Sequence, residues 1–219
     1  MRTVIVNNIV SLDGYYADAD GNPLRLNMDA EFDRANREDI ERAGTVLLGR
    51  ESFNGFSAYW PFIADAPEPS DPHSPESRRF SDVNRAISAR YNSIPKVVVS
   101  DHAIDPDNPW ADTTTVVSRD KLLRWLADER RRDGDDILIF GSRRTWNRLL
   151  VNGLVDELHL MVSPCALGDG VKLFDEPTDL ELIGCRSYQG SGNVQLRYRL
   201  LPHPTDVDAS TTRHDGRAS

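Results

Sequence analysis

The alternation of short apolar runs with amphipathic segments is the feature that most constrains the fold of this chain. Apolar runs of strand length occupy residues 3–10, 45–48, 96–100, 113–117 and 137–140. Helical patterns lie between or after them, at residues 29–43, 49–56, 76–91, 120–132 and 145–150. Strands that alternate with helices are typical of a parallel sheet with crossover helices. We therefore expect a parallel sheet over the first two thirds of the chain.

Local signals predict where some of these elements end. Asp29 is a suitable cap for the first helix, and Gly44 fits just past the end of that helix. Five prolines between positions 61 and 75 exclude regular structure in that segment. The segment is expected to form a long loop, and a loop of this kind can cover a binding site.

The alternation of strands and helices stops in the last third of the chain. Strand-like residues 154–164, 180–188 and 194–201 have no helices between them. They predict antiparallel strands at one edge of the sheet. The expected fold class is α/β: a three-layer α/β/α domain over residues 1–201, with a mostly parallel mixed sheet. Residues 202–219 are polar and aperiodic and carry two prolines, so they predict a disordered tail.

Composition limits the classes of function. The 219 residues fit one domain, and the formal charge of −9 argues against a broad nucleic-acid surface. No apolar run approaches the roughly 18 residues that a membrane span needs, and the first ten residues lack a signal-peptide pattern. Cys165 and Cys185 have no thiol or histidine at zinc-like spacing. We expect a soluble cytoplasmic protein that binds no metal, nucleic acid or membrane.

The most informative local feature is residues 46–53, a buried strand that stops at Gly49 and turns into a helix containing Ser52. Unpaired N–H groups at a helix start favour an anion, and Ser52 can donate its hydroxyl. Arg50 offers a planar fork that fits phosphate oxygens. The alternative is an ordinary capped helix with a solvated arginine.

A second junction of the same kind lies at residues 137–145, where an apolar strand ends at Gly141 and hydroxyl and basic residues open a helix. Ligands of open α/β sheets bind outside the carboxyl ends of the strands. Both junctions, together with Ser100 at the end of another strand, are therefore expected to face one crevice. Neither Gly-x-Gly-x-x-Gly nor a Walker-type Gly-Lys-Ser/Thr occurs, which argues against a standard Rossmann site or P-loop.

Three motifs, in order along the chain, resemble those of known reductases. Gly49-Arg50-x-Ser52-Phe53 resembles the cofactor signature of dihydrofolate reductases. Ser11-Leu12-Asp13-Gly14-x-x-Ala17 is similar to the entry loop of riboflavin-type reductases, and residues 154–174 resemble their C-terminal signature. The resemblance covers residues 2 to about 200. The chain is thus similar to the dihydrofolate reductase-like superfamily and its riboflavin biosynthesis reductase (RibD C-terminal domain)-like family.

The resemblance implies NADPH bound at the strand ends. Arg50 would lie near the 2′-phosphate, Ser52 near the diphosphate and Ser100 by the adenosine, with Arg143 and Thr145 as auxiliary contacts. The family often has a second glycine where this chain has Ser142, which can still cap the helix. The residues implied to contact the cofactor are Ile9, Tyr16, Ala17, Gly49, Arg50, Ser52, Ser100, Gly141, Ser142, Arg143 and Thr145.

The nicotinamide would be held by the backbone of Ile9 and of residues 16–17, which brings Asp13 close to the reacting ring. Asp13 is one candidate acid, and its alternative role is a turn aspartate that holds Gly14. Asp33 is the other candidate, because it stands roughly where dihydrofolate reductases keep their pterin-binding acid. Other acidic residues crowd the same helix, so a solvated helix face is the alternative for Asp33.

Two further groups are interpreted as structural. Asp156 and Glu157 are adjacent on a strand, so they point to opposite faces and cannot readily act together. His159 stands on an apolar strand without a partner at ligand spacing and is interpreted as a core histidine with satisfied hydrogen bonds.

The favoured function is an NADPH-dependent reductase of a pterin-like or aminopyrimidine-type ring, similar to 5-amino-6-(5-phosphoribosylamino)uracil reductase or dihydrofolate reductase. Its partners would be a small heterocyclic substrate and, by resemblance, a second copy in a homodimer. The alternative is a non-catalytic NADP(H)-binding sensor or scaffold of the same fold. A third possibility, an interaction domain, predicts no nucleotide binding.

Overall fold

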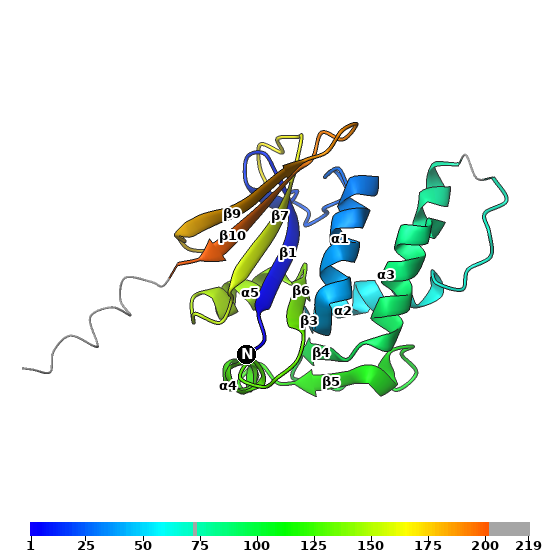
Figure 1. Cartoon of the computed structure of the whole chain (residues 1–219). Coiled ribbons are helices and arrows are strands. Elements are labelled where there is room, and N and C mark those ends of the chain that lie inside the picture. Colours follow the sequence, from blue (N-terminus) through cyan, green and yellow to red (C-terminus); the bar gives the residue numbers. More distant parts are fainter. Residues whose placement is uncertain (72–73, 202–219) are drawn as a thin grey trace, which may run out of the picture.

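The computed structural model describes residues 1–71 and 74–201. An eight-stranded sheet forms its centre (Figure 1). The strand order is β5-β4-β3-β6-β1-β7-β10-β9, and neighbours are parallel from β5 to β7. β10 runs antiparallel to both β7 and β9 at the edge. The sheet strands are β1 (Val4–Ser11), β3 (Ala43–Gly49), β4 (Lys96–Val99), β5 (Thr114–Val117), β6 (Asp136–Phe140), β7 (Glu157–Ser163), β9 (Leu180–Ser187) and β10 (Val194–Leu200).

Helices cover both faces of this sheet, which confirms the predicted α/β fold class. Alternate residues of β1 enter different cores: Val4 and Val6 pack beneath α4 and α5, whereas Ile5 packs on the side of α1 and α3. This two-residue period is the reason that both faces of β1 are apolar. The helices are α1 (Ala30–Arg42), α2 (Arg50–Ser57), α3 (Asp82–Ser93), α4 (Leu122–Glu129) and α5 (Arg143–Leu150), with short 3₁₀ helices η1 (Trp60–Phe62), η2 (Pro75–Phe80) and η3 (Ala111–Thr113).

The helix expected at residues 76–91 is divided, because Ser81 is extended and its hydroxyl accepts the Asn84 N–H at 3.3 Å to start α3 afresh. The first helix ends at Arg42, before Gly44 as predicted, but Ala43 is its C-cap and Gly44 is the second residue of β3. A Cβ on Gly44 would lie 3.0 Å from that of Asp135, so this glycine permits close packing at the start of the strand. The Asp29 cap is confirmed, since its carboxylate accepts the N–H groups of Glu31 and Phe32.

A small second sheet lies beside the main one. It pairs β2 (Tyr15–Ala17) with β8 (Val171–Lys172), and neither short strand was predicted. Through this pairing, the loop after β1 is held against the segment after β7.

The proline-rich segment packs against α3, beyond which it projects in Figure 1. The Arg85 guanidinium binds the carbonyls of Ala64 and Ala66, and Ser88 donates its hydroxyl to the carbonyl of Trp60. The predicted tail at residues 202–219 lies outside the described residues. None of the described helices is long and apolar enough to cross a membrane.

Candidate functional site

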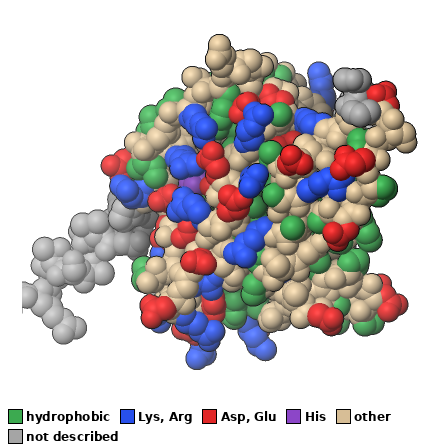
Figure 2. Space-filling model, turned by 45° about the vertical axis from the view of Figure 1, so that its right-hand side comes forward, with side chains coloured by type: hydrophobic (Ala, Val, Ile, Leu, Met, Phe, Trp, Pro, Cys, Tyr) green, Lys and Arg blue, Asp and Glu red, His purple; other side chains and the backbone are tan. Residues whose placement is uncertain are grey.

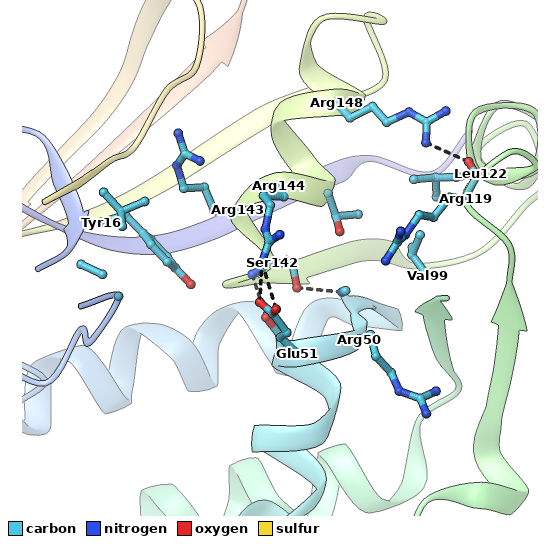
Figure 3. Close-up of a pocket in the computed structure, with 16 residues that line it drawn as sticks. Tyr16, Arg50, Glu51, Val99, Arg119, Leu122, Ser142, Arg143, Arg144 and Arg148 are labelled. Carbon is cyan, nitrogen blue, oxygen red and sulfur yellow. Dashed lines mark hydrogen bonds and ion pairs between the residues drawn. The ribbon is translucent and has the colours of Figure 1, made fainter. Parts of the chain in front are cut away.

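A cleft of about 560 Å³ opens at the carboxyl ends of the parallel strands (Figure 3). Both glycine junctions contribute to it, as expected for a ligand site of an open α/β sheet. Its lining residues are Tyr16, Ala17, Gly21, Gly49, Arg50, Glu51, Ser52, Val99, Arg119, Leu122, Ser142, Arg143, Arg144, Thr145, Arg148 and Val171.

Ser142 joins the two junctions by hydrogen bonds. Its hydroxyl accepts the Gly49 N–H at 3.0 Å and donates to the Phe140 carbonyl at 2.9 Å. Its own N–H donates to the Ser52 hydroxyl at 3.0 Å. The two helix starts are therefore fixed side by side, with their backbone N–H groups on the same cleft.

The backbone at this point is left-handed over two residues. Gly141 has φ of 54° and Ser142 has φ of 53°, and no other non-glycine residue in the described chain has a positive φ. A serine in this region is strained relative to a glycine. The strain is offset by the three hydrogen bonds of Ser142. A glycine at this position would keep the bond from its N–H and lose the two that the hydroxyl makes.

Gly141 leaves a space that a side chain would fill. A Cβ at this position would lie 3.3 Å from the Tyr16 hydroxyl and 3.4 Å from the Ser52 hydroxyl. Burial raises the pKa of Tyr16 above 10.0, so its hydroxyl keeps its proton at neutral pH. The backbone of Gly141 is therefore flanked by two hydroxyl groups that line the cleft.

The predicted basic contacts line the cleft, but their guanidinium groups are engaged by the protein. Arg50 donates to the carbonyls of His102 and Ala103 at 3.4 and 3.0 Å, and in Figure 3 it extends away from Ser142. Arg143 binds the carbonyl of Lys172 and the carboxylate of Asp175.

Three further arginines, Arg119, Arg144 and Arg148, line the cleft and were not predicted from the sequence. Arg144 and Arg148 are four residues apart on α5, so helical spacing after the Gly141 junction could have indicated them. Arg144 forms a bidentate contact with Glu51, at 2.9 and 2.8 Å, that joins the first turns of α5 and α2.

Three predicted cofactor residues do not line the cleft: Ile9, Ser100 and Gly141. Ile9 is buried in the core beside α1. Ser100 is buried, and its hydroxyl is bonded to the backbone of His102. Tyr16, Ala17, Gly49, Ser52 and Thr145 line the cleft together with Arg50, Ser142 and Arg143.

Asp13 holds a loop. Its carboxylate accepts the Ser11 hydroxyl at 2.6 Å and the backbone N–H groups of Gly168 and Leu167 at 2.8 and 3.1 Å. The hydrogen bond from Ser11, followed by that from Gly168, lowers the pKa of Asp13 to about 2. The carboxylate is thus ionised at neutral pH, and its assignment as an acid stays a prediction.

Asp33 is a buried carboxyl on α1 and does not line the cleft. It lies 3.3 Å from the Arg78 Nε and accepts the Asn84 amide at 3.2 Å. Burial raises its pKa above the ordinary value, against the opposing effect of Arg78. Asp33 therefore retains a proton more readily than Asp13, and its role also stays a prediction.

The structural interpretation of His159 is confirmed. Its Nδ1 lies 2.9 Å from the Asp39 carboxylate and its Nε2 lies 3.2 Å from that of Glu157. Asp156 accepts the Val4 N–H at 2.8 Å at the amino end of β1. In residues 1–71 and 74–201, no group of three or more His, Cys, Asp or Glu side chains is arranged to hold a metal ion.

Charged side chains outside the cleft are mixed in sign. Figure 2 shows one face of the molecule, on which Lys and Arg are interspersed with Asp and Glu.

Comparison with known proteins gives consistent matches. The model of the RibD C-terminal domain matches residues 2–196. The uncharacterized protein YyaP of Bacillus subtilis (strain 168) is 26% identical over 200 residues, covering 90% of this chain and 94% of its own.

Similar solved structures are reductases or riboflavin biosynthesis proteins. A putative riboflavin biosynthesis protein from Shewanella sp. PV-4 has a TM-score of 0.59 at 21% identity, over 91% of this chain and 99% of its own. Dihydrofolate reductase from Enterococcus faecalis, complexed with NADP(H), has a TM-score of 0.53 at 11% identity, over 90% and 96%. A deaminase/5-amino-6-(5-phosphoribosylamino)uracil reductase from Thermotoga maritima has a TM-score of 0.60 at 16% identity, over 91% of this chain and 57% of that one.

These structures share the fold of the present chain, and the family model spans the sheet and both glycine junctions. The chain belongs to the RibD C-terminal domain family.

Proposed function

We propose that this protein binds NADPH in the strand-end cleft and reduces a small pterin-like or aminopyrimidine-type ring. The observation that carries the proposal is the junction at Ser142, which joins two helix starts in one cleft, with Gly141 next to the Tyr16 and Ser52 hydroxyls of the cleft lining. The family adds support, because its structural neighbours include a dihydrofolate reductase with NADP(H) and an aminopyrimidine reductase.

The residues present suit a dinucleotide. The N-termini of α2 and α5 supply N–H groups and positive helix dipoles, which favour a diphosphate. Ser52 and Thr145 add hydroxyl donors, and Arg144 adds a cation next to them. Tyr16 and Ala17 lie on β2, which contacts β1, and the nicotinamide would be held there.

NADPH supplies a hydride when bound, so the protein has to position the ring, exclude water and provide one proton. Asp13 is ionised at neutral pH, so its carboxylate can accept hydrogen bonds from ring N–H groups. Asp33 favours its protonated form more than Asp13 does. Asp33 lies outside the cleft lining and 3.3 Å from the Arg78 Nε, so both carboxylates are kept as candidates for the proton source, and Asp13 in addition fixes the loop at residues 167 and 168.

A homodimer belongs to the same proposal. β9 is an edge strand, and its Leu182 and Ile183 are 55% and 38% exposed. An exposed apolar edge strand is suited to pairing with another chain. Light scattering is expected to give twice the chain mass, whereas a monomer at micromolar concentration would contradict this part.

The test of the function has a binding arm and a turnover arm. Quenching of tryptophan fluorescence is expected to saturate with NADPH, and NADPH oxidation is then followed with 5-amino-6-(5-phosphoribosylamino)uracil and, separately, with dihydrofolate. Oxidation that requires both the enzyme and one of these rings would support the reductase. Saturable binding without turnover would favour the non-catalytic sensor. That alternative is considered because Ser142 departs from the two-glycine pattern. Absence of binding would contradict both.

A further inference from the structure

The cleft has two distinct ends, because β3 and β6 separate β1 from β4, and β5 lies one strand farther away. Tyr16 and Ala17 line the β1 end, and Val99 and Arg119 line the β4–β5 end. Arg119 follows β5, and Figure 3 shows the Arg148 side chain reaching from α5 to the backbone carbonyl of Arg119. A dinucleotide whose nicotinamide lies near β1 would bring its adenosine to these arginines.

The arginines of the cleft differ in how completely their charge is compensated. Arg50, Arg143 and Arg144 each bind carbonyls or a carboxylate through their guanidinium groups. Arg148 donates to the backbone carbonyl of Arg119 at 2.9 Å and forms no ion pair within the described ranges. Arg119 lies 3.6 Å from a carboxylate and its side chain is 69% exposed.

That carboxylate, on Asp101 directly after β4, raises the question of which cofactor the site prefers. In dinucleotide sites an acidic residue commonly binds the free 2′-hydroxyl of NAD, whereas an arginine accommodates the 2′-phosphate of NADP. Asp101 accepts the backbone N–H of Arg119 at 2.9 Å with one oxygen and faces its Nε at 3.6 Å with the other. Both oxygens are therefore directed at Arg119, and the two terminal nitrogens of that guanidinium have no partner at hydrogen-bonding distance in the described chain.

We propose that Arg119 and Arg148 bind a phosphate monoester on the 2′-oxygen of the adenosine ribose and so set a preference for NADPH over NADH. Asp101 is a positioning residue that orients Arg119. Arg50, which the motif suggests for the 2′-phosphate, instead ties the start of α2 to the loop after β4 through the carbonyls of residues 102 and 103. The inference rests on the proposed function and names the part of the site that discriminates between the two cofactors.

The test is calorimetric titration of the full chain with NADPH and, separately, with NADH. Arg119→Ala and Arg148→Ala are each expected to weaken NADPH binding about ten- to a hundredfold, because each removes charged hydrogen bonds to phosphate. NADH binding should change less than about threefold, since NADH lacks the phosphate. Arg148→Lys is expected to restore part of the affinity by keeping the charge without the planar fork.

Arg124→Ala is the matched control, because Arg124 is a 93% exposed arginine on α4 that does not line the cleft. Circular dichroism of each variant checks that the fold is retained. Equal losses for NADPH and NADH in Arg119→Ala and Arg148→Ala would overturn the inference, as would a selective loss of NADPH in Arg50→Ala alone. Wild-type protein that binds both cofactors equally would overturn the inference and leave the proposed function standing. Wild-type protein that binds neither would overturn both.

Discussion

Arg2, at the amino ends of the strands, and Arg119 and Arg148, at the carboxyl ends, have opposite surroundings. At the amino ends of the strands, Arg2 is 7% exposed and donates to the Asp135 carbonyl at 2.7 Å, the Thr45 hydroxyl at 2.7 Å and Glu129 at 2.5 Å. At the carboxyl ends, Arg119 and Arg148 are exposed and mostly unpaired. A buried charge must be paired, whereas an exposed one is free to bind a ligand. The degree of pairing therefore distinguishes Arg2, which is structural, from Arg119 and Arg148, whose charge is available to a ligand.

The most disruptive way to test this comparison is Arg2→Ala. It removes the hydrogen bonds to the Asp135 carbonyl and the Thr45 hydroxyl and leaves Glu129 paired with Arg132 alone, at 2.9 Å, so it is expected to lower the free energy of unfolding by about 2–4 kcal/mol. Arg119→Ala, by contrast, should change it by less than about 0.5 kcal/mol. Urea unfolding measures both. Equal losses in the two variants would remove the distinction between the two ends.

Lys96 sharpens the comparison, because it is a buried cation at the amino end without a carboxylate partner in the described structure. Its ammonium donates to the carbonyls of Ile94, at 2.8 Å, and Tyr91 and lies 4.8 Å from the Trp110 ring centre. Burial lowers the pKa of Lys96 from 10.5 to about 8.

The folded chain therefore binds fewer protons than the unfolded chain between pH 8 and 10.5. The free energy of unfolding should rise with pH across this window by roughly 1–3 kcal/mol from this group. Lys96→Met should lose that rise in urea unfolding at several pH values. An unchanged slope in the variant would show that the ammonium is not desolvated in the fold.

Gly141→Ala tests the binding end without removing a charge. An alanine at φ of 54° is expected to cost about 1–2 kcal/mol of stability. Its methyl group would also enter the space beside the Tyr16 and Ser52 hydroxyls, so NADPH affinity should fall about tenfold or more. Gly153→Ala is the control, with φ of 64° and no neighbouring atom within 4 Å. Similar affinity in both variants would mean that the ligand does not approach Gly141.

Glu51→Gln gives the smallest expected effect. Glu51 holds Arg144 across the two helix starts, and its charge opposes that of a diphosphate. The variant is expected to bind NADPH about two- to fivefold more tightly at low salt, with the gain fading at high salt. Weaker binding in titrations at both salt concentrations would indicate that the ion pair helps to build the site.

The fold could be predicted largely from the sequence because its strands are apolar on both faces and alternate with helices. The Asp29 cap, the antiparallel edge and the two glycine junctions followed from short-range patterns. β2 and β8 did not, because strands of three and two residues have no period and pair only through tertiary structure. The partner of His159 was hidden for the same reason, since Asp39 lies 120 residues away on α1.

The sequence predicted which backbone positions form the site, but it predicted less well which arginines are free to bind a ligand there. Gly49, Ser52 and Ser142 are fixed by local strand-to-helix geometry, so a motif identifies them. The direction of a long side chain depends on which carbonyls and carboxylates lie nearby. Arg50 stands at the position that the motif indicates, but it turns to the carbonyls after β4, and Arg119 belongs to no motif.

The central claim is that NADPH binds at the carboxyl ends of the strands. A titration of ¹⁵N-labelled protein with NADPH tests it most directly, because the amides of both ends report in one spectrum. We expect saturable shifts of the Gly49, Ser52 and Ser142 amides, with those of Val4 and Asp156 at the amino ends unchanged. Shifts that are absent, or as large at Val4 and Asp156 as in the cleft, would contradict the account.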